Sequence, residues 1–410
     1  MVRIEPNARR GPAPERRKKL KQHSLIDKVY SPRNLAEAWD KVRRNKGCAG
    51  VDRRTVQHFE KHADRLLRAL HEQLKSGTYS TQAIRRVWIP KADGRKRPLG
   101  IPTVADRVVQ QAVLNVLAPI FERKFVESSH GFRPGRSTHT ALREVWKHVR
   151  GGLRWIVDAD IKGYFDTIPH ERLVDFVAEE VADGKVLSLV RQFLSAKVMD
   201  ELELKDVELG TPQGGVISPL LANIYLHYFD AKMEAEGYVV IRYADDFVVL
   251  CRTEQKAREA HSRVKQILEG ELALTVHPEK TKITHISRGI EFLGYAIQWQ
   301  RSLYAIPRDK SVERFKEKVR NLTRRSPRRR PQELIRRLNP VIRGWGNYYR
   351  KAHVRKLFWR LDQWILRRVR AHIAGKWRNQ ATEEYPMRVL WGHYRLVSLW
   401  MLSRRLKAHP

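Results

Sequence analysis

Two adjacent aspartates, Asp245 and Asp246, separate two strongly β-forming runs, and this pattern strongly limits how the chain can fold. Residues 239–243 before them and residues 247–250 after them are mostly apolar. The pattern predicts a hairpin of buried strands with both acids at its tip. An Asp-Asp pair often only makes a turn, but here two carboxylates would stand between buried strands. Carboxylates at the ends of core strands are how proteins hold cations that take oxygen ligands.

A third acid follows another apolar run. Residues 155–157 predict a short buried strand that leads to Asp160. If this strand lies beside the hairpin, Asp160, Asp245 and Asp246 converge on one site. Three carboxylates suit two Mg²⁺ ions about 3.5–4 Å apart, which activate an attacking hydroxyl and neutralise a leaving pyrophosphate. These residues therefore indicate a metal-dependent phosphoryl-transfer enzyme.

The charge of the chain indicates a polyanionic partner. Its 81 lysines and arginines outnumber 45 acids, for a net charge of +36, and residues 301–410 carry +23 of that total together with six of the 11 tryptophans. Phosphate contacts release counterions, so this charge favours nucleic acid over an acidic membrane surface. No apolar run reaches the roughly 20 residues of a spanning helix. The tryptophans could stack on unpaired bases or pack a helical core, and both roles stay open here.

The pattern of charge and periodicity predicts an α+β protein with five segments. They are a basic arm at 1–24, a helical extension at 25–75, mixed helices and strands at 76–298, a helical region at 299–380, and a short basic segment at 381–410. The arm lacks the apolar core of a secretory signal. The two cysteines are too few for a disulfide framework or a cysteine-ligated zinc site. We therefore expect a cytosolic protein in a reducing compartment.

Several motifs resemble those of reverse transcriptases and follow that family's order. The tetrapeptide at 243–246 resembles the signature catalytic turn, residues 160–166 resemble the first catalytic motif, and residues 210–220 resemble the segment that positions template and nucleotide. The resemblance implies a right-hand polymerase, with fingers and palm at 76–298 and an α-helical thumb at 299–380. Asp158 and Asp166, which flank the first motif, are expected to shape the backbone rather than bind metal.

Three further motifs resemble the maturase–reverse transcriptases encoded by group II introns of bacteria. They lie at 130–137, 291–295 and 343–350, and the whole resemblance spans roughly residues 25–380. Many of these proteins end in an endonuclease with cysteine pairs. This chain has only about thirty residues after the thumb region, so it resembles the short branch that lacks the endonuclease domain. The resemblance implies that the segment 381–410 is a candidate DNA-binding remnant and that the protein works in the bacterial cytosol or nucleoid.

The resemblance implies a catalytic role for four side chains. Asp160, Asp245 and Asp246 would bind two Mg²⁺ ions, with the Ile161 carbonyl as a further ligand and Mn²⁺ as a substitute ion. Lys280 would be the general acid that protonates the pyrophosphate, although Lys282 remains an alternative.

The same resemblance implies a nucleotide-binding role for five residues. Lys91 and Arg97 would grip the triphosphate, Gln213 would contact the incoming nucleotide near its 3′-OH, and Tyr164 and Phe165 would belong to the same binding site. Phe165 would act as a steric gate against the ribose 2′-OH. A plain core aromatic at 165 and ordinary solvated cations at 91 and 97 are the alternatives.

A larger group of residues is expected to contact nucleic acid. These residues are Arg133, Arg136, Gly294, Tyr295, Arg328, Arg329, Arg330, Arg343, Trp345, Tyr348, Tyr349 and Arg350. Gly294 and Tyr295 would belong to the primer grip. The expected partners are structured intron RNA, an RNA template, a DNA primer or target and deoxynucleoside triphosphates. No membrane is expected, and the sequence does not decide between a monomer and a dimer.

Three functions are compatible with this resemblance. The chain could be an active reverse transcriptase that also assists intron splicing, a maturase that only assists splicing, or a domesticated relative in repair, defence or spacer acquisition. The presence of all three acids and of Gln213 favours an active polymerase. The RNA structure encoded around the gene would decide whether an intron is involved.

Overall fold

The computed structural model describes residues 21–90, 96–200, 203–206, 209–211, 214–324, 330–373 and 380–404. The chain divides into two compact units, each built from two separate stretches of sequence. The first unit comprises residues 1–126 and 163–229, and the second comprises residues 127–162 and 230–410. The chain therefore passes between the units three times, with the last passage inside one helix, α10 (Ser218–Ala235).

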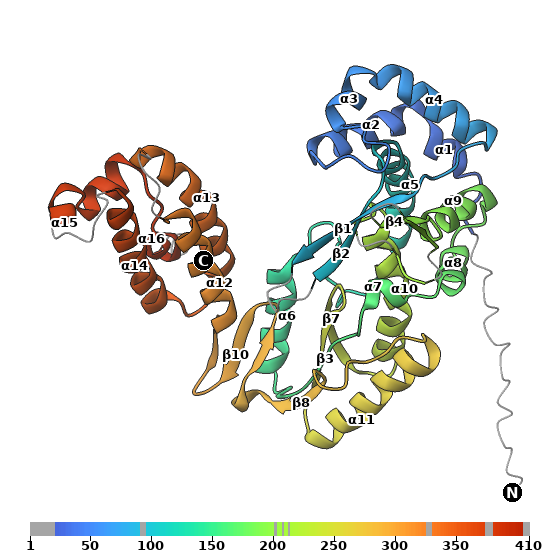
Figure 1. Cartoon of the computed structure of the whole chain (residues 1–410). Helices are drawn as coiled ribbons and strands as arrows, with labels where there is room; N and C mark the ends of the chain where they lie inside the picture. Colours follow the sequence, from blue (N-terminus) through green and yellow to red (C-terminus); the bar gives the residue numbers. More distant parts are fainter. Residues whose placement is uncertain are drawn as a thin grey trace, which may run out of the picture. The chain divides into compact units, whose positions relative to one another are not determined.

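The first unit is mainly helical and carries one small sheet (Figure 1). Besides the start of α10, its helices are α1 (Ile26–Tyr30), α2 (Pro32–Arg44), α3 (Val56–Lys61), α4 (Ala63–Ser76), α5 (Val104–Glu122), α7 (Tyr164–Thr167), α8 (His170–Ala178) and α9 (Gly184–Leu194). Its sheet has the order β2-β1-β4-β5, from β1 (Ile84–Pro90), β2 (Lys96–Ile101), β4 (Val198–Asp200) and β5 (Glu203–Lys205). The two strands predicted around residues 91–95 are confirmed as β1 and β2, while residues 91–95 lie outside the described residues.

Side-chain caps explain where helices of this unit begin. Ser31 accepts a hydrogen bond from the Asn34 N–H at the start of α2, and Thr103 accepts one from the Asp106 N–H at the start of α5. Such caps satisfy backbone donors that have no partner within the helix. Gly77 ends α4 with a φ of 77°, a conformation that costs glycine little.

The second unit contains two antiparallel sheets. The larger has the order β6-β7-β3-β8, from β3 (Trp155–Ala159), β6 (Val239–Tyr243), β7 (Asp246–Cys251) and β8 (Lys282–His285). The smaller has the order β11-β10-β9, from β9 (Ile290–Phe292), β10 (Tyr295–Trp299) and β11 (Leu303–Pro307). The helix α6 (Thr138–Arg150) contacts β6, β7 and β11, whereas α11 (Glu254–Lys265) contacts β3, β7 and β8. A π-helical turn, η1 (Gln266–Glu271), and a 3-10 turn, η2 (Ile286–Arg288), follow α11 and β8 respectively.

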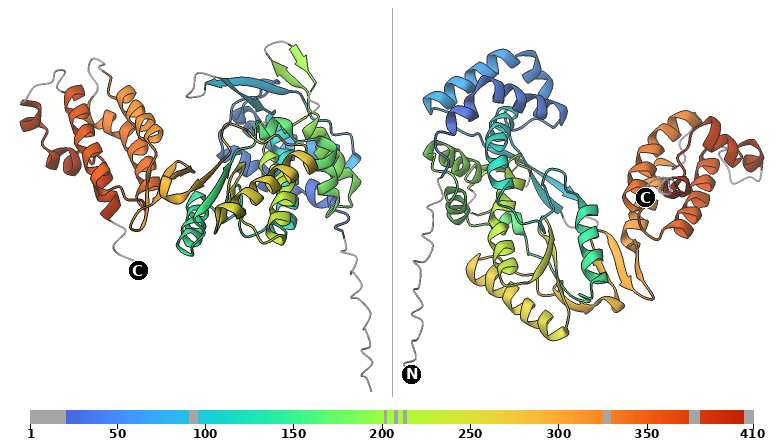
Figure 2. Two further views of the ribbon diagram at one scale, coloured as in Figure 1. Left: turned by 90° about the horizontal axis from the view of Figure 1, so that it is seen from below. Right: turned by 180° about the vertical axis from the view of Figure 1, so that it is seen from behind.

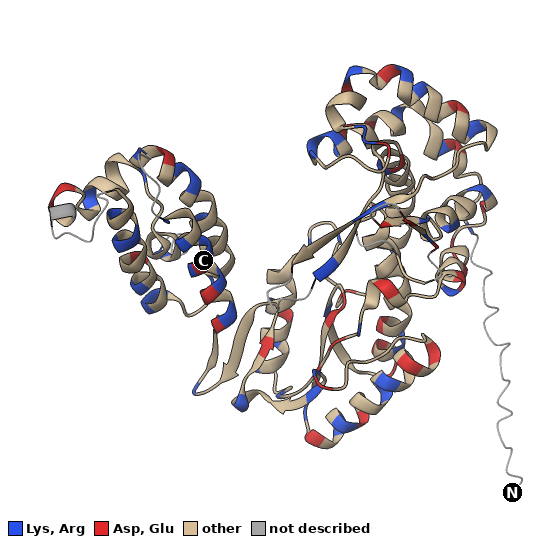
Figure 3. Ribbon diagram, in the orientation of Figure 1, with Lys and Arg blue, Asp and Glu red and all other residues tan. Residues whose placement is uncertain are grey.

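A bundle of helices completes the second unit (Figure 2). It consists of α12 (Asp309–Leu322), α13 (Pro331–Tyr349), α14 (Arg355–Ile373), α15 (Gln380–Glu384), η3 (Val389–His393) and α16 (Leu399–Arg404). Lysines and arginines recur along α12, α13 and α14 (Figure 3). The buried Asp362 of α14 accepts hydrogen bonds from the Leu399 and Trp400 N–H groups, which holds α16 against α14. The described part of 381–410 thus packs into the helical bundle, and a role in DNA binding for this segment stays a prediction.

The combination of helices with largely antiparallel sheets confirms the expected α+β fold class. Among the residues that the structure describes, no helix has the length and apolar character that crossing a membrane requires.

Candidate active site

The predicted hairpin is present, and its turn carries the acids. Tyr243 at the end of β6 pairs with Asp246 at the start of β7, so Ala244 and Asp245 form a two-residue turn. Ala244 has a φ of 60°, which an L-residue other than glycine adopts at a cost. The turn therefore needs contacts from the surrounding structure to hold its conformation.

The third acid lies on the neighbouring strand, as predicted. β3 pairs with β7, and the register that matches Ala159 with Phe247 brings Asp160 beside Asp246. Because side chains alternate along a strand, Asp158 lies on the same face of the sheet as Asp160. Asp158, Asp160, Asp245 and Asp246 all line one cavity of about 1020 Å³.

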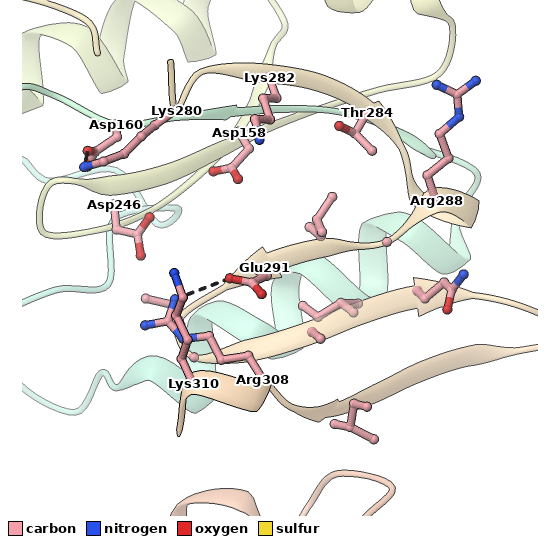
Figure 4. Close-up of a pocket in the computed structure, with 18 of the residues that line it drawn as sticks. Asp158, Asp160, Asp246, Lys280, Lys282, Thr284, Arg288, Glu291, Arg308 and Lys310 are labelled. Atoms are coloured by element: carbon pink, nitrogen blue, oxygen red, sulfur yellow. Dashed lines mark hydrogen bonds and ion pairs between the residues drawn. The ribbon is translucent and has the colours of Figure 1, made fainter. Parts of the chain in front are cut away.

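The cavity has a second wall of different character. It is formed by residues from β9, β10, β11 and the start of α12, including Glu291, Gly294, Arg308 and Lys310 (Figure 4). Arg308 lies 3.6 Å from Glu291 as an ion pair. The carboxylates thus face Arg308 and Lys310 across the cavity.

Burial and neighbouring carboxylates raise the pKa of two of the acids. Burial, followed by the charges of Asp158, Asp245 and Asp160, raises the pKa of Asp246 to about 7, and Arg308 opposes this shift. Burial and the charge of Asp160 raise the pKa of Asp158 to about 6. The raised pKa values mean that burial and neighbouring carboxylates disfavour the charged forms of Asp158 and Asp246, and a bound divalent cation would relieve this cost.

The donor set fits Mg²⁺ in chemical type, since carboxylate oxygens are hard ligands. Within the described ranges, however, no three acidic, histidine or cysteine side chains stand close enough to hold a metal ion as they are. Asp160 is instead ion-paired with Lys280. Backbone hydrogen bonds from His277 to the Asp160 carbonyl and from Lys162 to the Thr275 carbonyl, of 2.8 and 2.9 Å, fix the chain around Asp160.

The two candidate lysines occupy different places. Lys280 forms an ion pair with Asp160. Lys282 of β8 lies opposite Asp158 in the strand register, and its charge partly offsets the rise in the pKa of that carboxyl. Lys280 is the one in contact with a predicted metal ligand.

Comparison with known families agrees with this geometry. Residues 89–297 match the family described as reverse transcriptase (RNA-dependent DNA polymerase), and residues 312–391 match the maturase-specific domain of group II introns. Protein YkfC of Escherichia coli is 34% identical over 328 residues, covering 70% of this chain and 85% of YkfC. The chain belongs to the group II intron family of reverse transcriptases.

Other relatives extend this result. The group II intron-encoded protein LtrA of Lactococcus lactis is 32% identical over 332 residues, which cover 65% of this chain and 55% of LtrA. The chain thus spans about half the length of that relative. Among solved structures, a partial Cas6-RT-Cas1–Cas2 complex matches 60% of the chain at 24% identity and a TM-score of 0.39, a level from which no shared function follows.

The residues expected to bind the nucleotide lie in the first unit. Tyr164 is buried, and its hydroxyl donates to the Ala222 carbonyl at 2.5 Å. Phe165 is half-buried, and its carbonyl accepts a hydrogen bond of 2.6 Å from the Thr211 N–H. Arg97 is exposed on β2, while Lys91 and Gln213 lie outside the described residues. Their roles in this reverse transcriptase stay predictions.

The motif at 130–137 supports the catalytic turn. Gly131 lies so close to it that an added Cβ would come within 2.2 Å of the Ala244 nitrogen. Arg133 is only 7% exposed and donates to the Ser129 carbonyl at 2.8 Å, and Arg136 is ion-paired with Glu127. These arginines were expected to contact nucleic acid, and that role remains untested, but their hydrogen bonds stabilise the segment that lies against the turn.

The residues expected to bind RNA in the maturase-specific domain divide into two groups. Trp345, Tyr348 and Tyr349 pack inside the protein, with Trp345 stacked on Phe315 at 4.5 Å. Arg330 and Arg343 are exposed, and Arg350 is half-buried. Arg328 and Arg329 lie outside the described residues.

Three site residues were not singled out from the sequence as functional. Asp158 lines the cavity, Arg308 faces the acids from the opposite wall, and Arg242 is fully buried behind the turn. For Arg242 a signal existed, since a charged residue inside an apolar strand must have a buried partner.

Proposed function

We propose that this reverse transcriptase extends a DNA primer on an RNA template with two Mg²⁺ ions held by Asp160, Asp245 and Asp246. The observation that carries the proposal is the convergence of these acids, from the ends of two paired strands, on one cavity that Arg308 and Lys310 line from the opposite side. The Ile161 carbonyl is a further candidate ligand. When bound, the ions would activate the primer 3′-OH and stabilise charge on the phosphates.

The protein's own residues position the reactants. The turn at Leu293 and Gly294 lines the wall opposite the acids, together with Arg308 and Lys310. Basic side chains there suit the phosphates of the primer strand, with the primer terminus directed at the carboxylates. Lys280 Nζ, beside Asp160, is the proposed donor of a proton to the leaving pyrophosphate.

Selection of the nucleotide is assigned to the first unit. Lys91 and Arg97 would hold the triphosphate, Gln213 would contact the nucleotide near its 3′-OH, and the ring of Phe165 would exclude a 2′-hydroxyl. Tyr164, which is buried and hydrogen-bonded to the Ala222 carbonyl, would support this site without touching the nucleotide. Discrimination of this kind is steric and requires only that the ring face the sugar.

The basic helices supply the maturase half of the proposal. Exposed arginines and lysines on α12 to α14 suit the phosphates of folded intron RNA. A protein that binds the native RNA fold more tightly than other folds shifts the equilibrium toward it and assists splicing without chemistry of its own.

The test is the Asp245→Asn substitution. Primer extension on an RNA template should be abolished, while RNA binding stays near the wild-type level because affinity comes from the basic surface. The exposed Asp175, at the end of α8, offers a matched control, since Asp175→Asn should leave both properties unchanged. Extension by Asp245→Asn at a rate near wild type would refute the proposed site.

A further inference from the structure

The turn between β9 and β10 faces the acids across the cavity and has an unusual backbone. Leu293 has a φ of 47° and Gly294 a φ of 80°, so both residues adopt the left-handed conformation. Glycine tolerates this conformation, whereas a leucine adopts it at a cost that the surroundings must offset. Both residues line the cavity.

Two tyrosines of the maturase-specific domain hold this turn. The Tyr348 hydroxyl donates to the Leu293 carbonyl at 2.7 Å, and the Tyr349 hydroxyl donates to the Gly294 carbonyl at 3.1 Å. In return the Tyr295 hydroxyl donates to the Tyr348 carbonyl at 2.5 Å. Three hydrogen bonds therefore link the segment 293–295 to the end of α13.

The contact is tightly packed as well as hydrogen-bonded. Tyr295 and Tyr349 are 0% and 3% exposed, and their rings lie 4.9 Å apart. A Cβ added to Gly294 would come within 2.8 Å of the Tyr349 hydroxyl oxygen, so only glycine fits under that tyrosine. The position of the turn thus depends on both tyrosines.

The Tyr349 hydroxyl is itself oriented by a second group. It shares a hydrogen bond of 2.8 Å with the Ser311 hydroxyl, which also accepts one from the Trp345 indole at 3.3 Å. Trp345 is fixed by its stacking on Phe315. The conformation of the turn is in this way connected to the core of the helical bundle.

We propose that Tyr348 and Tyr349 are positioning residues for the primer terminus, through which the maturase-specific domain contributes to polymerisation. The inference rests on the proposed use of the cavity by the primer. The tyrosines act through the turn and need not touch nucleic acid, in contrast to the RNA contact expected from the sequence. Small displacements of a positioning group can lower a reaction rate by a large factor.

The substitutions Tyr348→Phe and Tyr349→Phe remove only the hydroxyls and keep the rings. The double variant should raise the KM for primer–template about fivefold or more, because a buried carbonyl without its donor allows the turn to move. The KM for the deoxynucleotide should change by less than about twofold, since the turn is not assigned to nucleotide binding. Tyr385→Phe, a half-buried tyrosine of the same domain, is the matched control and should match wild type.

A purely structural role predicts a different result. It would lower the thermal midpoint and the concentration of active enzyme, which active-site titration measures. The KM values of the enzyme that remains active would then equal those of wild type, and this outcome would overturn the inference. Ser311→Ala leaves both tyrosines in place and removes only the group that orients Tyr349, so it should raise the KM for primer–template by a smaller factor.

The Asp245→Asn variant and the tyrosine variants test the metal site and the positioning role separately. If Asp245→Asn extends primers normally, the proposed site is wrong. If Asp245→Asn is inactive while the tyrosine variants keep the wild-type KM for primer–template, only the positioning role is wrong.

Discussion

The Arg242 guanidinium and the Asp230 carboxylate form an ion pair in which the side chains are 0% and 1% exposed. Arg242 also donates to the Ala244 carbonyl and to the Ser129 hydroxyl, each at 2.8 Å. Strand alternation puts Arg242 on the opposite face of the sheet from the acids, so it fixes the catalytic turn from behind. The planar fork of an arginine suits this task because it reaches several acceptors at once.

Replacing Arg242 by lysine should therefore impair use of the metal. A lysine keeps the charge but cannot reach Asp230, Ala244 and Ser129 together. We expect the Mg²⁺ concentration for half-maximal extension to rise about tenfold, as for other groups that orient metal ligands. Direct Mn²⁺ titration by electron paramagnetic resonance should show the same loss of affinity.

A double variant separates this role from stability. Removing one partner of a buried ion pair costs about 3–5 kcal/mol, whereas replacing both by apolar residues can be nearly neutral. Arg242→Met combined with Asp230→Leu should therefore recover much of the thermal stability but not the affinity for Mn²⁺. Full recovery of both would show that Arg242 has no specific effect on the turn.

His130 should make the protein sensitive to acid. Burial and then the charge of Arg136 lower the pKa of His130 from 6.5 to about 4. Below pH 6.5 His130 becomes protonated in the unfolded chain but stays neutral in the folded chain, so the free energy of unfolding decreases as the pH falls toward 4. The loss amounts to up to about 3 kcal/mol over this range.

His130→Asn tests this effect, because asparagine can keep the hydrogen bond that the His130 Nδ1 makes with Thr140 at 2.9 Å. Denaturant unfolding of the variant should show about 2 kcal/mol less loss of stability between pH 7.5 and pH 5 than wild type. Parallel curves for the two proteins would contradict the assignment.

Phe165→Val tests the proposed sugar gate. A smaller side chain should admit ribonucleotides, so the ratio of kcat/KM for deoxy- and ribonucleotides should fall by more than about fivefold, or about 1 kcal/mol. Phe176→Val, which removes another half-buried aromatic of the same unit, should leave the ratio unchanged. A ratio that stays within fivefold would indicate that Phe165 is a core aromatic.

RNA binding should be strongly electrostatic. The logarithm of the affinity should fall with the logarithm of salt concentration with a slope of magnitude above ~3, since several phosphates are neutralised. Arg314 and Lys318 are exposed one turn apart on α12, and their joint replacement by glutamine should reduce that slope by about 1–2. A flat salt dependence of the wild-type protein would contradict this account.

The sequence was informative where local pattern determines structure. The β-forming runs on either side of Asp245 and Asp246 predicted the hairpin, and the apolar run before Asp160 predicted the neighbouring strand, because strand preference and turn chemistry are local. The roles of Tyr348 and Tyr349 were not predictable in this way. Their hydrogen bonds join residues 55 positions apart, and only tertiary packing brings these groups together.

For Arg133 and Asp158 the sequence predicted a role that the position of the side chain does not match. An arginine within a motif of a basic protein favours a nucleic-acid contact, yet Arg133 is buried against the Ser129 carbonyl. Asp158 was expected only to shape the backbone, but its side chain lines the cavity with the three catalytic candidates. In both cases the direction of the side chain decides its role, and composition does not contain that information.

The hydrogen bonds from Tyr348 and Tyr349 have a consequence for how such enzymes diversify. A chain shortened to residues 1–311 would retain all the acids and the whole segment matched to the reverse transcriptase family, yet the Leu293 and Gly294 carbonyls would lose their tyrosine donors. The two family segments are therefore not freely exchangeable modules. A chimera that joins this polymerase segment to the maturase region of a relative should function only if that region supplies hydroxyl donors at the same two places.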